Sequence, residues 1–436
     1  MTETIGRVSR PGHGGVCDRL VPVLERFARG PLPVRLRAWD GSEAGPDGAP
    51  VVVLRTPRAL RRVLWHPGEL GVAQAYVTGE LDIEGDVSDL LRLAWTTARD
   101  RHLSGPPGPR ARGLGLQGLG SAAATAARLG LLGPPLPAPA TQARVRGWTH
   151  SRGRDRSVIA HHYDLTADFY RLLLDPAMAY SCARWESGAA GYTLAEAQWA
   201  KLDSICRKLG LADGQAGKPG QTGKTLLDLG CGWGSLTLHA ASQYGARVDA
   251  VTLSAEQAAF VRERVRSSDL AEVATVQETD YRDVDGRHYD AIATIEMGEH
   301  VGARQYPAFC ARLRRLLAAD GRLLIQQMSR DGRAPGGGPF IESYIAPDMH
   351  MRPVGETVAL LERAGLEVAH VEGMRRDYGR TIRAWLDNFE RHEDEITRLI
   401  GAEQVRVWRL YLHGGALAFE EGRMGVHQIV AVRREG

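Results

Sequence analysis

The pattern of apolar and polar positions predicts a small mixed unit at the start of the chain. Apolar residues recur at helical spacing in some segments and cluster as in strands in others, and a turn-rich stretch covers residues 40–48. The predicted elements are helices at 19–28, 57–65, 70–76 and 87–98 and strands at 34–39 and 51–54. We therefore place an α+β domain at residues 1–103. It has no acid, base or metal-ligand cluster that stands out, so by itself it indicates a binding or docking module, and we expect it to dock to a lipid or a membrane.

Glycine and proline dominate the next part of the chain. Residues 104–120 and 130–139 are rich in both, and a short alanine-rich helix is predicted between them. This composition is poor at burying a core and is typical of a tether. We place a linker at residues 104–150 and a second domain at residues 151–436.

Strands and helices alternate in the second domain. Strands are predicted at 226–229, 248–253, 274–278, 289–295 and 322–327, with helices at 194–209, about 235–241 and 255–266. The tail segments 354–364, 366–371 and 385–410 add mostly helix, and 428–433 closes as a strand. This alternation predicts an α/β domain with a doubly wound parallel sheet, in which ligands bind at the carboxyl ends of the strands.

A glycine loop follows the first strand of that sheet. Gly230, Gly232 and Gly234 remove side chains where the strand turns into a helix, so that the backbone can approach a ligand. The loop lacks the Lys-Ser/Thr of a phosphate loop, and its spacing is GxGxG rather than the GxGxxG of dinucleotide sites. The loop alone predicts a nucleotide-like cofactor without naming it.

The ends of the next two strands carry polar residues. Thr252 and Leu253 end the second strand, Ser254 is a candidate helix cap, and Gln257 stands at the capping-box position. Asp280 and Tyr281 follow the third strand. Because parallel strands end at one edge of a sheet, these residues are expected to surround one cofactor.

Composition and charge restrict the function only modestly. The chain has 436 residues, 43% of them hydrophobic and 25% charged, and a net charge of +3, which gives no support to nucleic-acid binding. Residues 1–150 contain 19 arginines, no lysine and 13 acidic residues, a balance of +6. That excess could favour an anionic membrane surface, or it could reflect an arginine-rich genome composition.

The five cysteines are scattered without a pairing pattern, which is typical of reduced thiols in a cytosolic protein. The start of the chain lacks the apolar run of a signal peptide, and no uncharged apolar stretch reaches membrane-spanning length. We expect a cytoplasmic protein that reaches the inner membrane surface peripherally. No metal site is predicted.

Six motifs stand in an order that resembles one family. They are His162-Tyr-Asp-Leu165, Tyr180-Ser-Cys-Ala183, Leu227-Asp-Leu-Gly-Cys-Gly-Trp-Gly234, Val251-Thr-Leu-Ser-Ala-Glu-Gln257, Met297-x-Glu-His-Val-Gly302 and Tyr378-x-Arg-Thr-x-x-Ala-Trp385. This set resembles the cyclopropane-fatty-acyl-phospholipid synthase family of class I S-adenosylmethionine (SAM) methyltransferases. That family includes the mycolic acid cyclopropane synthases and the enzymes of 10-methyl fatty acid formation. The resemblance covers about residues 155–433, and 71–91 fits the longer members.

The resemblance implies a SAM site with a Rossmann-like fold. Its predicted contacts are Tyr180, Ser181, Asp228, Gly230, Gly232, Gly234, Thr252, Leu253, Gln257, Asp280 and Tyr281. Gln257 is suited to a hydrogen bond with the cofactor, Tyr281 to stacking on adenine, and Asp228 to orienting the loop or meeting the amine. Plain core packing stays an alternative for Leu253 and Tyr281.

The resemblance also implies a base for the reaction. In the family a bound bicarbonate ion takes a proton from the methylated substrate, and the matching positions here are Cys182, Glu299, Gln326, Met328 and Tyr378. We predict Cys182, Glu299, Gln326 and Tyr378 as catalytic. Gln326 replaces the usual His and Met328 the usual Ile, and a Gln cannot exchange a proton near neutral pH. Gly415 stands where many relatives have a nearby Cys.

Aromatic faces are expected to stabilise the carbocation of such a reaction. The candidates are Tyr163, Phe169, Tyr170, Trp185 and Tyr378. Residues 336–338 and 340–351 are a candidate flap over the acyl site, with an ordinary surface loop as the alternative.

The function implied by the resemblance is SAM-dependent methyl transfer to the cis double bond of an unsaturated phospholipid acyl chain. Loss of a proton from the carbocation would give a cyclopropane or a 10-methylene precursor of a 10-methyl fatty acid. Phospholipid acyl chains at the membrane are the expected partners; a homodimer and a reductase for the methylene product stay open. Two alternatives also stay open: a methyltransferase for a small heteroatom nucleophile, and a non-catalytic lipid-binding protein.

Overall fold

The computed structural model describes residues 14–101, 125–144, 147–155, 165–213, 223–332 and 335–434. The chain divides into two compact units, Met1–Ala140 and Thr141–Gly436. The polar leader, most of the glycine-rich segment after residue 101, and the motif residues 162–164 lie outside the described residues.

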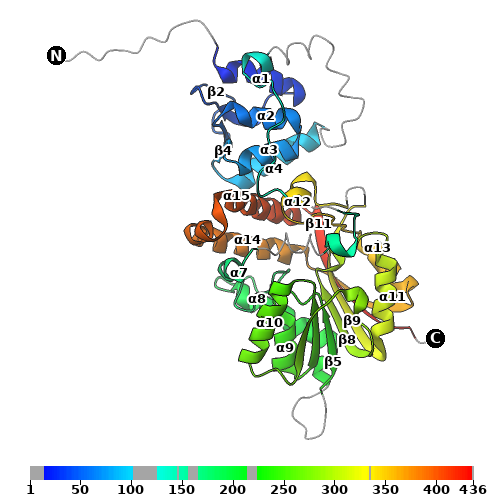
Figure 1. The fold of residues 1–436 in the computed structure, drawn as a ribbon. Helices are drawn as coiled ribbons and strands as arrows, with labels where there is room; N and C mark the ends of the chain where they lie inside the picture. The colour runs from blue at the N-terminus through cyan, green and yellow to red at the C-terminus, as the bar shows by residue number, and fades with distance from the viewer. Residues whose placement is uncertain are drawn as a thin grey trace, which may run out of the picture. The chain divides into compact units, whose positions relative to one another are not determined.

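The first unit is the predicted small α+β fold, drawn in blue in Figure 1. Its sheet has the order β2-β1-β3-β4, in which β1 and β3 are parallel and the other pairs are antiparallel. The strands are β1 (Arg35–Arg37), β2 (Glu43–Ala44), β3 (Val51–Leu54) and β4 (Leu81–Glu84). The helices are α1 (Val16–Phe27), α2 (Pro57–Trp65), α3 (Glu69–Val77) and α4 (Val87–Asp100). The short strands β2 and β4 were missed by the sequence pattern.

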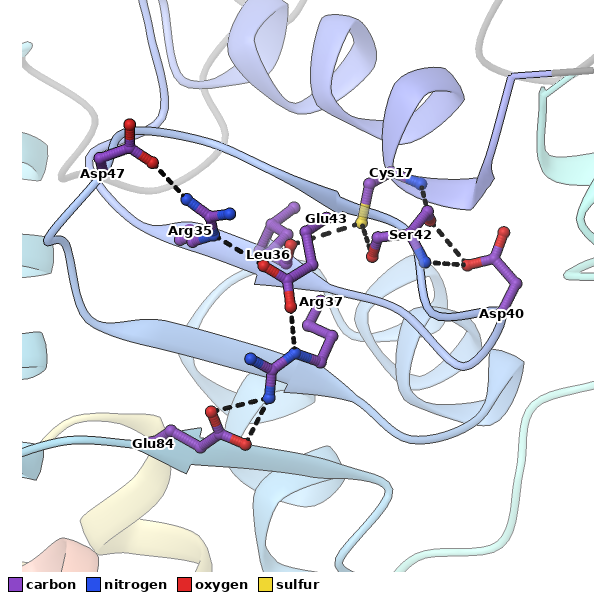
Figure 2. A network of polar contacts seen from close by, with 9 residues as sticks. All are labelled: Cys17, Arg35, Leu36, Arg37, Asp40, Ser42, Glu43, Asp47 and Glu84. Atoms are coloured by element: carbon purple, nitrogen blue, oxygen red, sulfur yellow. Dashed lines mark hydrogen bonds and ion pairs between the residues drawn. The ribbon is translucent and has the colours of Figure 1, made fainter. Parts of the chain in front are cut away.

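Ion pairs cross the surface of this sheet, as Figure 2 shows. Arg35 and Arg37 lie two residues apart on β1, so both side chains project from one face and both donate to Glu43. Arg37 also donates to Glu84 on β4, at 2.6 Å and 2.8 Å. The buried thiol of Cys17 on α1 faces the backbone carbonyl of Ser42 at 3.2 Å. Arg35 and Arg37 are therefore paired with acidic residues of the same sheet.

The described part of the predicted linker packs on α2. Arg62 is only 4% exposed, pairs with Glu80 at 2.7 Å, and donates to the Pro137 carbonyl at 3.0 Å. The Trp65 indole donates to the Gly133 carbonyl at 3.0 Å. These bonds give fixed partners to backbone carbonyls around residues 133–137.

The second unit is built on a seven-stranded sheet of order β10-β11-β9-β8-β5-β6-β7. The strands are β5 (Thr225–Leu229), β6 (Arg247–Thr252), β7 (Ala274–Glu278), β8 (Tyr289–Ile295), β9 (Leu317–Arg330), β10 (Leu366–Gly373) and β11 (Met424–Arg433). The pairs from β9 to β7 are parallel, whereas β11 runs antiparallel to β9 and to β10. The strand order reverses between β5 and β8, which is where ligands bind in doubly wound sheets.

Helices cover both faces of this sheet, with α8, α9 and α10 on one side and α11 and α13 on the other (Figure 1). The remaining helices include α14 and α15, which pack on each other. The bounds are α7 (Ala167–Leu173), α8 (Leu194–Lys208), α9 (Ser235–Tyr244), α10 (Ala255–Ser267), α11 (Tyr306–Leu316), α12 (Pro339–Tyr344), α13 (Val354–Arg363), α14 (Arg375–Arg391) and α15 (Glu393–Glu420), with short 3-10 turns η2 (Leu211–Asp213), η3 (Tyr281–Asp283) and η4 (Gly298–His300). The predicted α/β fold is thus confirmed.

Three element predictions need correction. Residues 366–371, expected as part of a mostly helical tail, form the edge strand β10, whose apolar Leu366 and Val368 alternate at strand spacing. The predicted strand 322–327 extends to all of β9. The predicted helix 385–410 is interrupted at His392, between α14 and α15, and again at Gly401, where α15 has a kink with φ +79°. Tertiary pairing with β11 and packing between the helices decide these boundaries.

An aromatic core lies among α7, α14 and α15. Phe169 packs edge-on against Trp408 with ring centroids 4.7 Å apart, and Tyr170 packs against Trp233 at 5.2 Å. Among the described residues, no helix is long and apolar enough to cross a membrane.

Candidate functional site

A pocket opens at the carboxyl ends of the central strands. Its empty space is about 890 Å³, open mouth included. It is lined by the β5 loop, the ends of β6 and β8, and the residues after β7: Gly230, Gly232, Val251, Thr252, Leu253, Gln257, Thr279, Tyr281, Arg282, Ile295, Glu296 and Met297, with His150, Asp155, His300, Val301, Pro347 and Asp348 around them. It therefore lies at the predicted switch point.

Gly230 and Gly234 have different structural roles in the loop. Gly230 lines the pocket with φ +84°, and a Cβ added there would meet Met297 Cγ at 3.0 Å. Gly234 is instead the N-cap of α9, where a Cβ would meet Val261 Cγ1 at 2.7 Å. Gly230 keeps space at the ligand side, and Gly234 allows α9 and α10 to pack closely.

Gln257 presents a free donor to the pocket. Ser254 caps α10 by accepting from the Gln257 backbone N–H at 3.2 Å, as predicted, but the Gln257 side chain turns away from the cap. Its Oε1 accepts from the Thr252 hydroxyl at 2.8 Å, so Nε2 is the amide atom that stays available for a ligand. Nε2 is buried and has no partner among the described residues. A ligand oxygen or nitrogen would satisfy it.

The neighbouring side chains of Tyr281 and Asp280 have different surroundings, and Tyr281 alone of the two lines the pocket. The Tyr281 ring lines the pocket and packs edge-on against Phe309 at 5.3 Å. The Asp280 carboxylate turns to Arg282, which bonds it at 2.8 Å and 2.5 Å. Burial by itself raises the pKa of Asp280, but the bonds from Arg282 hold the pKa below its usual value.

Asp228 lies beneath the glycine loop, where its Oδ2 accepts from the Thr237 hydroxyl at 2.7 Å. Burial raises its pKa to about 6. Tyr180, Ser181, Asp228, Gly234 and Asp280 are thus the predicted cofactor residues that do not line the pocket. The other predicted contacts, Leu253 among them, do.

The predicted catalytic residues gather around a carboxylate that the sequence analysis missed, that of Glu296. Glu296 Oε2 accepts from the Tyr378 hydroxyl at 2.5 Å. Its Oε1 accepts from the Cys182 backbone N–H at 2.9 Å and from Gln326 Nε2 at 2.8 Å. Three donors from three separate segments therefore converge on one carboxylate at the pocket wall.

The backbone of Glu296 is strained. Its φ of +52° is rare for a residue with a side chain and costs about 1–2 kcal/mol. Such strain is found at functional sites, where the surrounding structure holds it in place. The available signal was an acid directly after a buried strand at the switch point, one residue before the motif that starts at Met297.

Glu299 has a different environment, although it is also fully buried. Its Oε1 accepts from the Met328 backbone N–H at 2.6 Å, and Oε2 has no partner among the described residues. Burial and the nearby charge of Glu296 raise the pKa of Glu299 to about 8. The Glu296 carboxylate accepts three donors and the Glu299 carboxylate accepts one, so hydrogen bonding favours the ionised form of Glu296 more, while the raised pKa of Glu299 favours its protonated form.

The segment 179–182 is held from α8. Lys201 is 1% exposed, and its ammonium donates to Ser181 Oγ at 2.9 Å. Gln198, one turn earlier, donates to the Ser181 carbonyl at 2.9 Å. The Cys182 thiol faces the Ala183 carbonyl rather than Glu296, and burial raises its pKa well above the usual value. The sequence signal for Lys201 was a lysine on the apolar face of a predicted helix.

Aromatic rings pack around Tyr180 and Tyr378, and Tyr378 donates to the Glu296 carboxylate. Tyr180 packs on Tyr170 at 5.4 Å and on Trp385 at 5.2 Å, and Tyr378 packs on Phe419 at 4.3 Å. Among the predicted aromatic residues, Phe169 lies in the core, Trp185 stacks under Arg380 at 4.4 Å, and Tyr163 lies outside the described residues. In the candidate flap, Phe340 and Tyr344 of α12 are buried.

A doubly wound sheet with a GxGxG loop and a switch-point pocket is the expected architecture of a SAM-dependent methyltransferase, and the family match shows that the chain is one. The chain belongs to the mycolic acid cyclopropane synthetase family, whose model matches residues 150–429. The pocket fits SAM, because Gln257 Nε2 awaits an acceptor and Gly230 leaves the loop open to a ligand.

Relatives match the chain over almost its whole length. A probable fatty acid methyltransferase of Mycobacterium tuberculosis is 35% identical over 95% of this chain and 94% of its own. A probable fatty acid methyltransferase of Pseudomonas putida is 33% identical over 95% of both chains. The tuberculostearic acid methyltransferase UfaA1 of M. tuberculosis is 30% identical over 92% of this chain and 88% of its own.

Solved structures match nearly two thirds of this chain. The cyclopropane synthase MmaA2 of M. tuberculosis has a TM-score of 0.59 and 30% identity, covering 64% of this chain and 98% of its own. The mycolic acid cyclopropane synthase CmaA1, complexed with SAH and CTAB, has a TM-score of 0.58 and 31% identity over 63% of this chain and 97% of its own.

Proposed function

We propose that this enzyme transfers a methyl group from SAM to the cis double bond of an unsaturated phospholipid acyl chain, with Glu296 as the base. The carrying observation is the buried Glu296 carboxylate, which accepts bonds from Tyr378, Gln326 and the Cys182 backbone. Full-length relatives named as fatty acid methyltransferases support the lipid substrate.

Bound SAM supplies an electrophilic methyl group. The π electrons of the alkene would form the new carbon–carbon bond while the sulfur–methyl bond breaks, S-adenosylhomocysteine would leave, and the substrate would become a carbocation with no basic atom of its own. The rings of Tyr180, Tyr378 and Trp385 offer electron-rich faces near the cation, and the Glu296 carboxylate offers negative charge set in advance. An alkene is a weak nucleophile, so a dry, aligned site is required.

Glu296 then takes a proton from the new methyl carbon. Two of the side chains expected to hold a bicarbonate ion, Gln326 and Tyr378, bind this carboxylate instead, and Cys182 reaches it through its backbone N–H. We therefore propose that the Glu296 carboxylate serves in place of bicarbonate. This role also accounts for Gln326, which needs only to donate a hydrogen bond and not to exchange a proton.

We propose a 10-methylene acyl chain as the product, formed when a hydride shift precedes loss of the proton. The support is that the relatives matched over more than nine tenths of this chain are named as fatty acid and tuberculostearic acid methyltransferases, whereas the named cyclopropane synthase MmaA2 matches 64% of it. Such a product would need a reductase to become a 10-methyl chain. The bilayer location of the substrate implies peripheral contact with a membrane surface.

The test supplies purified protein with SAM labelled by ¹³C at the methyl group and vesicles of dioleoyl phosphatidylglycerol. We expect the released fatty acids to gain one labelled CH2 by mass spectrometry, with exocyclic methylene signals by NMR. Cyclopropane signals would overturn the methylene proposal and keep the methyl-transfer proposal. If SAM binds by calorimetry and no acyl chain gains a carbon, the lipid substrate is wrong.

A further inference from the structure

A chain of buried side-chain amides connects Glu296 to α8. Gln326 Nε2 donates to Glu296 Oε1 at 2.8 Å, and Gln428 Nε2 donates to Gln326 Oε1 at 2.9 Å. Lys208 Nζ in turn donates to Gln428 Oε1 at 2.5 Å. Three consecutive hydrogen bonds therefore link the proposed base to a lysine outside the pocket lining.

The sheet places the two glutamines side by side. Gln326 on β9 and Gln428 on β11 are direct partners in the antiparallel register, so their side chains project from the same face. Both side chains are completely buried. Lys208 is the last residue of α8, is half-buried, and also pairs with Glu372 on β10.

The direction of this chain is set at its lysine end. A protonated lysine only donates, so the carbonyl oxygen of the Gln428 amide must face Lys208. The Gln428 nitrogen then faces Gln326, whose own carbonyl oxygen must turn to accept it. The Gln326 nitrogen is left to donate to Glu296 and, at 3.3 Å, to the Cys182 carbonyl.

The opposite orientation would harm the site. If the Gln326 amide were reversed, its carbonyl oxygen would face the Glu296 carboxylate and the Cys182 carbonyl, where two acceptors repel each other. A free glutamine has little preference between the two orientations. A buried amide is stable only when its donors and acceptors all have partners, so the hydrogen bonds from Lys208 and Gln428 determine the orientation of the Gln326 amide.

We propose that Lys208 and Gln428 are positioning residues that hold the Gln326 amide with its nitrogen toward Glu296. This inference rests on the proposed role of Glu296 as the base. The hydrogen bond from Gln326 Nε2 then favours the ionised form of the Glu296 carboxylate and fixes its orientation. Neither Lys208 nor Gln428 touches substrate or cofactor in this role.

Several other groups also set the charge of Glu296. The titratable and charged groups around it are Cys182 and its adjacent segment, Lys201 on α8, Glu299 on η4, Tyr378 and Asp377 on α14, and Tyr411 on α15. All of them are the same in the wild type and in the variants below. A difference between variants therefore reports the amide chain.

The decisive variant is Gln428→Leu, which breaks the chain without changing any charge. We expect the pKa of the Glu296 carboxyl to rise by about one pH unit, the size of effect that one hydrogen bond to a charged group can have. Infrared titration measures it in substrate-free protein, with Glu296→Gln as the subtraction reference. The acid limb of the turnover profile should move to higher pH by the same amount.

Lys208→Met provides the second variant and should shift the same pKa in the same direction, while Lys208→Arg, which keeps a donor-only head, restores it. The matched control is Glu372→Gln, which removes the ion partner of Lys208 and leaves its bond to Gln428. A shift in the control equal to that in Lys208→Met, or an unshifted pKa in Gln428→Leu, overturns the proposal. Because the infrared titration needs no turnover, a failure of the lipid-methylation proposal appears separately, as absent product in the wild type.

Discussion

The hydroxyl of Tyr378 lies 2.5 Å from Glu296 Oε2, so α14 meets the end of β8 at a single carboxylate. The other oxygen of this carboxylate is held by Gln326 and by the backbone of Cys182. Burial raises the pKa of Glu296 above its ordinary value, and these three donors limit that rise. The three donors favour the ionised form of this buried carboxylate, as its proposed removal of a proton from a hydrocarbon cation requires.

Replacement of that carboxylate is the most direct test of the mechanism. Glu296→Gln keeps the size of the side chain but cannot accept a proton, so we expect turnover to fall by about 10²–10⁴-fold, the usual contribution of a general base. The affinity for SAM should change little, because Gln257 and the glycine loop remain. Calorimetry and single-turnover kinetics separate the two quantities, and turnover near the wild-type rate would remove Glu296 from the mechanism.

Loss of the tyrosine hydroxyl should alter the pH dependence rather than cofactor binding. In Tyr378→Phe the Glu296 carboxylate loses its shortest hydrogen bond, so we expect its pKa to rise by about one to two pH units. The acid limb of the turnover profile should move upward accordingly. Tyr411→Phe is the matched control, because the Tyr411 hydroxyl bonds Tyr180 at 3.2 Å and not Glu296. Equal profiles for the two variants would contradict this prediction.

The sequence predicted the parts of the fold that depend on local pattern. The buried strand before Gly230, the polar residues at Thr252 and Gln257, and the parallel alternation all appear in the structure. The edge strand β10 was missed because its burial is slight and its pairing with β11 is made by residues more than 50 positions away.

The centre of the site was harder to predict. Glu296 carries no local signature beyond its place after β8, and its importance arises only because Cys182, Gln326 and Tyr378 converge on it from distant parts of the chain. Lys201 likewise looks like one polar position on an amphipathic helix until Ser181 is packed against it. Side-chain orientation, which separates Asp280 from Tyr281, is a tertiary property that adjacency in sequence does not reveal.

Alanine substitutions at Gly230 and Gly234 of the same loop should have different effects, one on SAM binding and one on stability. Gly230→Ala places a methyl group 3.0 Å from Met297 at a φ of +84°, so we expect SAM affinity to fall by about tenfold or more. Gly234→Ala pushes against Val261 at 2.7 Å, so we expect the free energy of unfolding to drop by about 1–3 kcal/mol. Isothermal calorimetry and urea unfolding on both variants check the contrast, which reversed results would refute.

Protonated Glu299 should make the stability of the SAM-free protein depend on pH. Its pKa of about 8 when folded exceeds the ordinary 4.5 of an unfolded glutamate, so the folded state holds a proton that the unfolded state has lost. The contribution to stability is fully present below pH 4.5 and is lost as the pH rises toward 8. We expect a slope of up to about 1.4 kcal/mol per pH unit in between.

Glu299→Gln tests that dependence, because the amide does not titrate. Other buried carboxyls, such as Asp228 with a pKa of about 6, contribute slopes of the same sign, so the informative quantity is the difference between wild type and variant. Urea unfolding at several pH values between about 5 and 8 measures both slopes. Parallel curves for the two proteins would show that Glu299 is ionised in the folded state.

Gln257 should determine part of the affinity for the cofactor. Thr252 fixes the amide by donating to its oxygen, and the buried Nε2 has no partner among the described residues until a ligand supplies one. Gln257→Leu removes this donor at similar volume, so we expect the dissociation constant for SAM to rise about tenfold, as for one hydrogen bond.

Thr252→Val tests whether SAM affinity depends on the orientation of the Gln257 amide as well as on its presence. It keeps the Gln257 amide but frees it to rotate, so its loss of SAM affinity should be smaller than that of Gln257→Leu. The melting temperature of the SAM-free Gln257→Leu protein should fall modestly, because the Thr252 hydroxyl loses its acceptor, Gln257 Oε1; Thr252→Val, which removes the same hydrogen bond, is the comparison. Wild-type SAM affinity in Gln257→Leu would place the cofactor away from this side of the pocket.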